Sequence, residues 1–333
     1  MTAKQLQFVI LGSGINGLSC AIRLSEEFPN SKIQIISEQF SPNTTSDVAA
    51  GLWGPYILGG TPDAKCRFVI QNKKVQIEDF ISIFVVSEDG RMNHTTISCN
   101  YGELDLPIAC GKLNLSQITN FQGSYSVAFM YATFTCEPSK MMNYYYDILS
   151  ARNVQFLQKR IQSINCLEML NISSNAIIVN CLGFNSKYVF NDCELFPVRG
   201  QVQKVKANFV FHSIACESCY IIPNTDTVVL GGTKQKSNNL NVNFVDRYNI
   251  RNNCHDTLPA LKEAIMVTDN VGLRPVRRSG VRLELENITS ANGRNYAVIH
   301  NYGHGGAGIT LAWGCAGTVV QLVQRYAAKG SKL

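Results

Sequence analysis

The sequence predicts an α/β fold that opens with a strand–helix–strand unit. An apolar run, Leu6–Leu11, is followed by the glycine-rich segment G-S-G-I-N-G at residues 12–17. The next stretch, residues 18–24, places its apolar side chains on one helical face, and Lys32–Ile36 is a second β-like run. A strand, a glycine turn, a helix and a strand in this order are typical of a Rossmann-like parallel sheet.

The glycine spacing in this unit predicts a nucleotide site. Gly12 allows the tight turn, Gly14 lets the backbone approach a pyrophosphate, and Gly17 lets the helix pack close to the strand. The helix N-terminus then presents free N–H groups to the phosphates. Glu38 follows the second strand, where it can accept hydrogen bonds from a ribose hydroxyl. We expect a bound dinucleotide, NAD or FAD; the alternative is a tight turn that binds nothing.

Composition narrows the class of protein. At 333 residues the chain has room for one large domain or two. Its 45% hydrophobic and 16% charged residues predict a folded protein rather than a disordered one. The net charge of +6 comes from scattered residues, which argues against a nucleic-acid surface, and the apolar runs are too short for a membrane span. The 12 cysteines lack zinc-site spacing and are expected to be free thiols.

Two short motifs outside the opening unit need an interpretation. The chain ends in Ser331, Lys332 and Leu333, the S-K-L tripeptide that the peroxisomal import receptor binds. We therefore expect a location in the peroxisomal matrix and this receptor as a partner. Cys216 and Cys219 form a C-x-x-C without a thioredoxin-like context, so two packed thiols are the favoured interpretation and a redox pair is the alternative.

The middle of the chain mixes strands and helices. Residues 59–140 alternate poorly and predict a strand-rich segment with β-runs at Phe80–Ser87 and Ser124–Thr135. Ser139–Arg160 has apolar residues at helical spacing. The fully apolar run Ala176–Asn180 suits a buried parallel strand.

The last third carries a hairpin and a second glycine-rich turn. Tyr220–Pro223 and Thr227–Leu230 predict two strands of a hairpin. The stretch Tyr296–Thr310 predicts a strand, a glycine turn and the start of a helix, so its backbone N–H groups would face negative charge. His300 and His304 flank this turn and are expected to be structural rather than proton carriers.

Three segments together carry a family resemblance. G-S-G-I-N-G at 12–17, E-Q-F-S-P-N-T-T-S-D-V-A-A-G-L-W at 38–53 and Y-G-H-G-G at 302–306 resemble the D-amino-acid oxidase and D-aspartate oxidase family. The resemblance implies a Rossmann-like FAD-binding domain interleaved with a mainly antiparallel β-sheet substrate domain. The implied FAD-binding segments are 1–58, 141–190 and 291–333, and the implied substrate-binding segments are 59–140 and 191–290.

The resemblance implies FAD as the cofactor and places its binding residues in both glycine turns and the segments between them. It also puts Tyr56 near the substrate cavity. The implied FAD-binding residues are Gly12, Ser13, Gly14, Ile15, Asn16, Gly17, Glu38, Gln39, Thr44, Thr45, Ser46, Gly51, Leu52, Val179, Gly303, Gly305, Gly306, Gly308, Ile309 and Thr310.

An amino-acid oxidase must hold the α-carboxylate, and a planar guanidinium does so bidentately. The family's G-[FL]-R-P motif falls on Arg274 and its Y-I-x-P motif on Tyr220, while the backbone at Gly306 would meet the amine. The implied reaction is hydride transfer to FAD from a D-amino acid that is bound with a neutral amine, without a side-chain base. Dioxygen then reoxidises FAD to give hydrogen peroxide, and the imino acid hydrolyses to a 2-oxo acid and ammonia.

The motifs that bear on the preferred substrate resemble both branches of the family. G-G-T-K-Q-K at 231–236 and V-G-L-R-P at 271–275 are similar to the D-aspartate branch, which has an arginine where Lys234 stands. Lys234 could therefore meet a side-chain carboxylate. A second arginine of that branch is replaced here by Ser213, and a second tyrosine of the neutral branch by Cys216.

These departures leave three hypotheses. We favour oxidation of D-aspartate and D-glutamate. A D-amino-acid oxidase for neutral substrates is the first alternative, because L-W-G-P-Y at 52–56 is closer to that branch. A catalytically weakened flavin-binding paralogue is the second. Arg199 could be a functional cation, but a structural ion pair is the better interpretation. The oligomeric state stays open.

Overall fold

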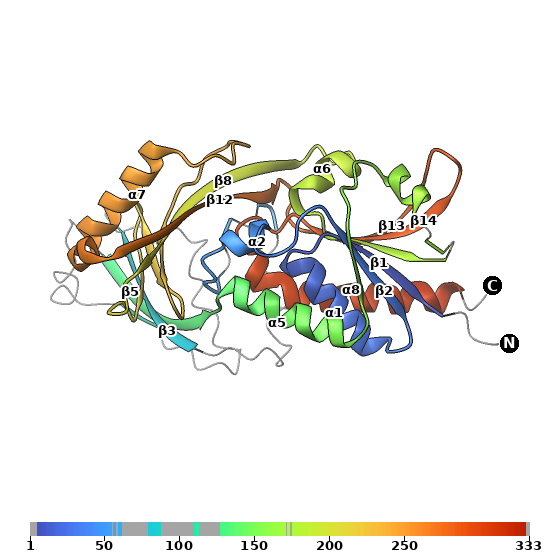
Figure 1. The fold of residues 1–333 in the computed structure, drawn as a ribbon, viewed down its shortest axis with the longest axis horizontal. Helices are drawn as coiled ribbons and strands as arrows, with labels where there is room; N and C mark the ends of the chain where they lie inside the picture. The colour runs from blue at the N-terminus through green and yellow to red at the C-terminus, as the bar shows by residue number, and fades with distance from the viewer. Residues whose placement is uncertain are drawn as a thin grey trace.

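The described residues form two β-sheets that lie end to end in an elongated molecule (Figure 1). The computed structural model describes residues 5–54, 56, 57, 59–61, 79–87, 110–112, 127–170, 172, 173 and 175–330. The two described ends of the chain lie beside the six-stranded sheet, and helix α7 (Phe244–Thr257) lies at the far end of the eight-stranded sheet.

The six-stranded sheet is parallel except at one edge. Its order is β13-β14-β7-β1-β2-β6, and only the β13–β14 pair is antiparallel. β1 and β7 are central, and their apolar residues are almost fully buried, as expected for parallel strands covered on both faces. The strands are β1 (Gln7–Leu11), β2 (Lys32–Ser37), β6 (Gln155–Gln158), β7 (Ile177–Asn180), β13 (Arg282–Thr289) and β14 (Asn295–Tyr302).

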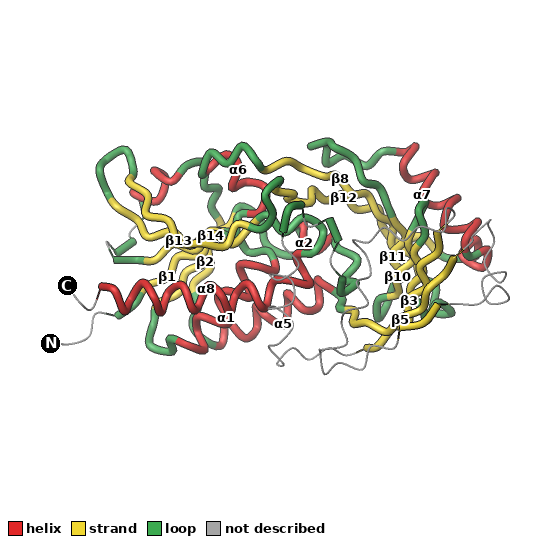
Figure 2. Tube along the Cα trace, turned by 180° about the vertical axis from the view of Figure 1, so that it is seen from behind, coloured by secondary structure: helices red, strands yellow, loops and turns green. Residues whose placement is uncertain are grey.

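Three helices cover one face of this sheet (Figures 1 and 2). They are α1 (Ile15–Glu27), α5 (Pro138–Ala151) and α8 (Gly308–Gly330). α1 buries Leu18, Ile22 and Leu24 against the sheet, because these residues recur at helical spacing. The other face packs against the 3₁₀ helix η2 (Ile164–Met169) and the short α6 (Ser186–Val189).

The eight-stranded sheet is mainly antiparallel, in the order β12-β8-β11-β10-β9-β3-β5-β4; only β3 and β9 pair in parallel. Its longest strands, β8 and β12, reach toward the six-stranded sheet (Figure 1). α7 (Phe244–Thr257) covers one face. The strands are β3 (Asp79–Ser87), β4 (Cys110–Lys112), β5 (Val127–Thr135), β8 (Leu195–Lys206), β9 (Ser213–Ala215), β10 (Tyr220–Pro223), β11 (Val228–Gly231) and β12 (Ile265–Arg277).

Most predicted elements are confirmed, including both strands of the opening unit, its helix and the hairpin of β10 and β11. The helix predicted over Ser139–Arg160 is shorter: it ends at Ala151, and Gln155–Gln158 form β6. The domain division needs one correction. We expected 191–290 to belong to the substrate domain, but β13 pairs with β14 along its whole length and so lies in the six-stranded sheet. Most of residues 59–126 lies outside the described residues, as do Ser331–Leu333. In the described part of the chain, no helix is long and apolar enough to cross a membrane.

Candidate active site

The turn between β1 and α1 is shaped for contact with a ligand. Gly12 has φ +100°, and a Cβ added there would lie 2.5 Å from the carbonyl oxygen of Cys181. A Cβ at Gly17 would lie 1.9 Å from the carbonyl oxygen of Gly12. Gly14 differs: its φ of −69° suits any residue, and an added Cβ would meet only Oγ of Ser46, at 3.0 Å. The space beside Gly14 is therefore open, as close approach of a phosphate requires.

Residues after β2 close over this turn. Oγ of Ser46 accepts a hydrogen bond of 3.0 Å from the backbone N–H of Ile15, and Oγ of Ser13 donates to the carbonyl of Gln39 at 2.6 Å. These bonds bring the segment after β2 to the N-terminus of α1. Glu38 stands directly after β2, with its side chain 38% exposed. It lies where a ribose would follow a pyrophosphate bound at α1.

The segment that continues from there holds its shape through its own contacts. Thr44 caps the short helix α2 (Thr45–Val48), and its backbone N–H donates to Oδ2 of Asp47 at 2.9 Å. The carbonyl of Gly51 accepts a hydrogen bond of 2.9 Å from the backbone N–H of Cys136, and Leu52 forms a β-bridge with Thr135. The predicted FAD-binding segment 44–52 thus runs from the N-terminus of α1 to the edge of the second sheet.

The second glycine turn lies next to the first. Gly308 begins α8, and a Cβ added there would lie 3.7 Å from Nδ2 of Asn16 in α1 and 3.9 Å from Cβ of His304. Thr310, in the first turn of α8, exchanges hydrogen bonds of 3.0 Å with both the N–H and the carbonyl of Gly54. Two helix N-termini therefore converge on the same region, where each favours negative charge.

Two buried polar atoms in this region lack a partner among the described residues, namely Oδ1 of Asn16 and Nε2 of His304. His304 is 2% exposed, and burial lowers the pKa of its imidazole to about 4, so the ring is neutral. Buried polar atoms are normally hydrogen-bonded, so these two atoms fit a polar ligand at the junction of the turns. Together with the open space at Gly14, they fit a flavin nucleotide bound between α1 and α8.

The side chain of Val179 is fully buried in the sheet, so only its backbone could reach such a ligand. His300 is structural, as expected. Its Nε2 lies 2.9 Å from Oε2 of Glu286 and its Nδ1 lies 3.1 Å from Nδ2 of Asn180. Burial and the nearby charge of Arg282 lower the pKa of His300 to about 4, although Glu286 opposes this.

Arg274 stands on the face of the eight-stranded sheet that faces the glycine turns. A Cβ at Gly200 of β8 would lie 2.4 Å from Nη1 of Arg274, so the guanidinium lies flat over that glycine. Nη1 donates to the carbonyl of Thr233 at 3.0 Å and to that of Arg199 at 3.4 Å. The centroid of the Tyr56 ring lies 5.6 Å from Cζ of Arg274.

Tyr220 begins β10 and lies beside Arg274. Its ring rests on the backbone of Gly231 and Gly232, because a Cβ at either position would fall within 2.6 Å of the ring or its hydroxyl. Burial raises the pKa of Tyr220, and the charge of Arg274 and a hydrogen bond with it act in the opposite direction. The hydroxyl therefore stays protonated and available as a donor beside the guanidinium.

Tyr56 connects this cluster to the second glycine turn. A Cβ at Gly306 would lie 2.4 Å from Cδ1 of Tyr56, whose ring also faces Arg274. The structure therefore brings Arg274, Tyr220 and Gly306 together around Tyr56, which is 41% exposed. These residues come from separate parts of the chain and meet where the two sheets approach each other.

Lys234 is exposed and makes no ion pair or hydrogen bond with a described residue. It lies between Thr233, whose carbonyl holds Arg274, and Gln235, whose side chain donates to Oδ1 of Asp246 in α7 at 2.8 Å. Side chains alternate along an extended segment, so Lys234 and Gln235 point to opposite faces of the sheet. Gln235 faces α7, and Lys234 therefore stands on the face that carries Arg274.

Two alternatives left open by the sequence are decided by the contacts. Arg199 is 2% exposed and pairs with Asp246 at 2.7 Å, which confirms the structural ion pair. Cys216 and Cys219 are free thiols with their sulfur atoms 3.4 Å apart. Their mutual hydrogen bond and burial raise the pKa of Cys216, which is typical of packed thiols rather than of a reactive pair.

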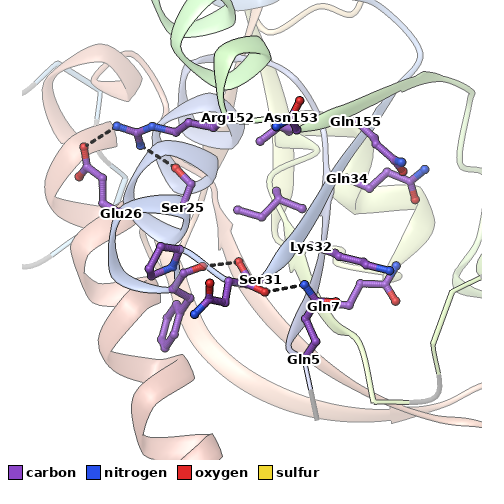
Figure 3. Close-up of a pocket in the computed structure, with 15 residues that line it drawn as sticks. Gln5, Gln7, Ser25, Glu26, Ser31, Lys32, Gln34, Arg152, Asn153 and Gln155 are labelled. Carbon is purple, nitrogen blue, oxygen red and sulfur yellow. Dashed lines mark hydrogen bonds and ion pairs between the residues drawn. The ribbon is translucent and has the colours of Figure 1, made fainter. Parts of the chain in front are cut away.

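A cavity of about 820 Å³ lies elsewhere, between the ends of α1 and α5 (Figure 3). It is lined by Gln7, Lys32 and Gln155, the first residues of β1, β2 and β6. In open α/β sheets ligands bind at the carboxyl ends of the strands, where Gly12 and Glu38 lie here. The cavity is at the opposite edge and is not part of the candidate active site.

Comparison with known proteins gives the family. Residues 7–322 match the DAO family, described as FAD dependent oxidoreductase. The chain belongs to this family. It is 34% identical to a D-amino acid oxidase from Dugesia ryukyuensis, over 96% of this chain and 97% of that protein. It is 31% identical to a D-aspartate oxidase from Homo sapiens, over 95% and 94%.

The fold agrees with this assignment. Glycine oxidase from Bacillus cereus superposes with a TM-score of 0.74 at 18% identity, covering 97% of this chain and 96% of that one. The protein is an FAD-dependent oxidoreductase, and the glycine turns described above are the parts that fit FAD. Sequence reasoning missed Thr233 and Gly200 as supports of Arg274. A glycine inside the strand pattern of β8 was the available signal, because it marks close approach of another group.

Proposed function

We propose that the protein oxidises D-amino acids, preferably D-aspartate and D-glutamate, to 2-oxo acids, ammonia and hydrogen peroxide. The observation that carries the proposal is the guanidinium of Arg274, held flat over Gly200 beside the hydroxyl of Tyr220. A planar guanidinium with a neighbouring hydroxyl donor suits an α-carboxylate. The D-amino acid oxidase and D-aspartate oxidase among its relatives support the reaction type.

The residues of the cluster bind and orient the substrate in this proposal. Arg274 holds the α-carboxylate bidentately, and Tyr220 donates a further hydrogen bond to it. The backbone of Gly306 faces the amine, so that the single hydrogen on the α-carbon of a D-amino acid points toward the cofactor site. Neither Arg274 nor Tyr220 offers a base, so the amine binds in its neutral form. FAD held at the two glycine turns would supply the redox chemistry, namely a hydride acceptor for the α-carbon and the means of reducing dioxygen.

The preference for acidic substrates rests on Lys234. It is an exposed cation without a described acidic partner, one residue from the carbonyl that holds Arg274. A second carboxylate on the substrate can therefore meet Lys234 while the first meets Arg274. Charge-assisted contacts of this kind contribute about 1.5–3 kcal/mol when shielded from water and less when exposed.

The experiment is a peroxide assay of the FAD-loaded enzyme with D-aspartate, D-glutamate, D-alanine and L-aspartate. We expect the highest kcat/KM with D-aspartate and no peroxide from L-aspartate. Lys234→Ala should lower kcat/KM for D-aspartate and leave D-alanine nearly unchanged. Lys262→Ala is the control, because Lys262 is an exposed lysine in the 3₁₀ helix η4 (Pro259–Glu263), which packs with α7 on the opposite face of the sheet. An equal loss on both substrates in Lys234→Ala would exclude its assigned role.

A neutral substrate is the second candidate, favoured by the D-amino acid oxidase from Dugesia ryukyuensis. It predicts a higher kcat/KM for D-alanine than for D-aspartate in the same assay. A catalytically weakened protein would bind D-aspartate and perturb the flavin spectrum without bleaching it under anaerobic conditions. Anaerobic bleaching by D-aspartate would exclude that hypothesis.

We also propose that the enzyme is imported into the peroxisomal matrix through Ser331, Lys332 and Leu333. The tripeptide matches the signal that the import receptor binds, and a peroxide-forming reaction suits that compartment. A fluorescent protein fused before residue 1 should co-localise with a peroxisomal marker. Deletion of 331–333 should disperse it; unchanged localisation after the deletion would exclude this signal.

A further inference from the structure

Arg199 lies directly behind the substrate face, on the opposite side of the eight-stranded sheet from Arg274. Its side chain points toward α7 and pairs with Asp246, whereas Arg274 lies over Gly200 on the other face. Alternate residues of a strand point to opposite faces, which accounts for this arrangement of neighbours. Arg199 therefore cannot touch a substrate held by Arg274, and any effect on the reaction must pass through other residues.

All five N–H donors of this buried guanidinium have acceptors. Besides Asp246, the acceptors include the carbonyls of Asn239 and Asn241, at 2.9 and 2.8 Å. Side-chain oxygens of Gln235 and Gln201 complete the set, at 2.9 and 2.7 Å. Three of these acceptors belong to the segment 233–243, which we call the selection loop because it carries Lys234.

Other hydrogen bonds that tie the selection loop to the rest of the protein are made to Gln201, at both ends of the loop, and to Asp246, which accepts from Nε2 of Gln235 at 2.8 Å. The loop contains one β-bridge, between Gln235 and Arg199 itself, and Leu240 is 60% exposed, so apolar packing does not fix the loop. The far end of the loop is tied by Gln201, whose Oε1 accepts from the N–H of Asn243 at 2.8 Å and also from Arg199. The side chain of Arg199 thus orders the middle of the loop directly and the end of the loop through Gln201.

The backbone of Arg199 also contacts Arg274, the residue that would bind the α-carboxylate. Its N–H donates to the carbonyl of Gln235 at 2.7 Å, and its own carbonyl accepts from Gln235 at 3.1 Å and from Nη1 of Arg274 at 3.4 Å. The same Nη1 donates to Thr233, at the start of the loop. The position of Lys234 relative to Arg274 is therefore set within one connected network that has Arg199 at its centre.

We propose that Arg199 is a positioning residue for substrate selection, which fixes the selection loop so that Lys234 meets the second carboxylate of an acidic D-amino acid. The inference rests on the proposed function above. The charge of Arg199 is neutralised by Asp246, so it does not itself attract the substrate. Arg199 instead fixes the distance between the cations of Arg274 and Lys234. This distance matters only for substrates that carry two carboxylates.

The test is Arg199→Lys in the FAD-loaded enzyme. A lysine keeps the charge for Asp246 but its ammonium cannot span the five acceptors. We expect KM for D-aspartate to rise by about tenfold, since small displacements of positioning groups have effects of this size or larger. KM for D-alanine and kcat for both substrates should change much less. An equal loss on D-aspartate and D-alanine would overturn the inference and leave the proposed function standing.

Two further variants keep the test valid if Arg199→Lys folds poorly. Gln235→Ala removes the two side-chain hydrogen bonds of Gln235, to Arg199 and to Asp246, but leaves the Arg199–Asp246 pair. It should shift the ratio of the two KM values in the same direction by less. Arg247→Lys is the matched control, because Arg247 pairs with Asp269 at 2.6 Å from the same helix as Asp246. It should leave the ratio unchanged; a shift equal to that of Arg199→Lys would overturn the inference.

Hydrogen exchange gives a readout that does not depend on activity. Amides of residues 237–243 should exchange faster in Arg199→Lys, while those of β1 and β7 stay protected. Unchanged exchange in the loop would overturn the inference even if kinetics shifted. If the wild-type enzyme oxidised no D-amino acid, the proposed function would fail, and the exchange result would still show whether Arg199 orders the loop.

Discussion

Two regions of the molecule bind their ligands with different groups. The nucleotide half is the pair of glycine turns at the six-stranded sheet, and the substrate half is the face of the eight-stranded sheet that carries Arg274. The first is built mainly from backbone: two glycine turns and the N-termini of α1 and α8. The second is built from side chains, with Arg274 and Tyr220 laid over glycines of neighbouring strands. Backbone dipoles suit a ligand whose phosphates lie along one chain segment, whereas a small amino acid needs charges from several directions.

The difference extends to charge. In the nucleotide half, the buried groups next to the glycine turns, His304 and Asn16, are neutral. In the substrate half, a buried cation at Arg199 is neutralised by Asp246, so that Arg274 and Lys234 are left for the substrate. We infer that changes at the first region alter cofactor retention, and changes at the second alter turnover and selection.

Arg274→Ala tests this separation most severely. Removing the guanidinium leaves the α-carboxylate without its partner, which costs about 2–5 kcal/mol for a desolvated charge pair. We expect kcat/KM to fall by 10² to 10³-fold, as an order of magnitude, on every D-amino acid. FAD absorbance and affinity should not change. Arg278→Ala, an exposed arginine just past the end of β12, is the control; loss of FAD from Arg274→Ala would break the comparison.

Acid should weaken the nucleotide half through its two buried histidines. The pKa values of His300 and His304 are lowered from 6.5 to about 4, so the folded protein binds fewer protons than the unfolded chain between these values. Stability is therefore full above pH 6.5 and is lost as the pH falls toward 4, by about 3 kcal/mol per histidine. Urea unfolding of the enzyme at pH 7.5, 6.5 and 5.5 measures this.

The controls for the acid effect are built into the same experiment. Between pH 7.5 and 8.5 the unfolding free energy should stay constant, because both histidines are already neutral. His304→Gln should flatten the slope between pH 6.5 and 5.5. If the stability rose as the pH fell, the imidazoles would be charged in the folded state, and the contrast between a neutral and a charged half would be wrong.

The two halves also differ in how well the sequence predicts them. The nucleotide unit is local: Gly12, Gly14, Gly17 and Glu38 follow one another through a strand, a helix and a strand, so spacing alone indicates the site. The substrate cluster is assembled from Tyr56 and residues of β10, β12 and the second glycine turn, which lie far apart in the chain. Only a family motif could point to Arg274 and Tyr220.

Contacts that depend on how distant elements pack could not be predicted from the sequence. α7 was not predicted, because its polar composition gives almost no helical periodicity. The acidic partner of Arg199 could not be predicted either, because Asp246 lies in the first turn of α7. β13 was assigned to the wrong domain for a similar reason: its side chains alternate weakly in exposure, and only pairing with β14 shows its sheet.

Gly14→Ala probes the nucleotide half at its most specific point. The backbone conformation at Gly14 accepts alanine, and the added Cβ meets only Oγ of Ser46 at 3.0 Å, so the apoprotein should keep its thermal stability. The methyl group would occupy space meant for the cofactor. We expect FAD affinity to fall by roughly tenfold or more, as overpacking typically costs about 1–3 kcal/mol. Fluorescence titration of the apoprotein with FAD measures this.

Gly17→Ala is the matched variant for that experiment. Its Cβ would lie 1.9 Å from the carbonyl oxygen of Gly12, so the apoprotein itself should lose stability. The comparison becomes sharper if Gly14→Ala alone retains a wild-type melting temperature without FAD. It breaks if both variants lose stability equally, because Gly14 would then serve the fold rather than the ligand.

Tyr220→Phe has the smallest expected effect. It separates the role of the Tyr220 hydroxyl in substrate binding from the packing of the Tyr220 ring. The ring can keep its contact with Gly231 and Gly232, so only the hydroxyl beside Arg274 is lost. A hydrogen bond of this kind contributes about 1 kcal/mol, so kcat/KM should fall by about fivefold on D-aspartate and D-alanine alike. Tyr302→Phe is the control: its hydroxyl donates to Asp192 at 2.7 Å, so the variant should lose stability but keep kcat/KM. A loss confined to D-aspartate would instead place Tyr220 at the second carboxylate, beside Lys234.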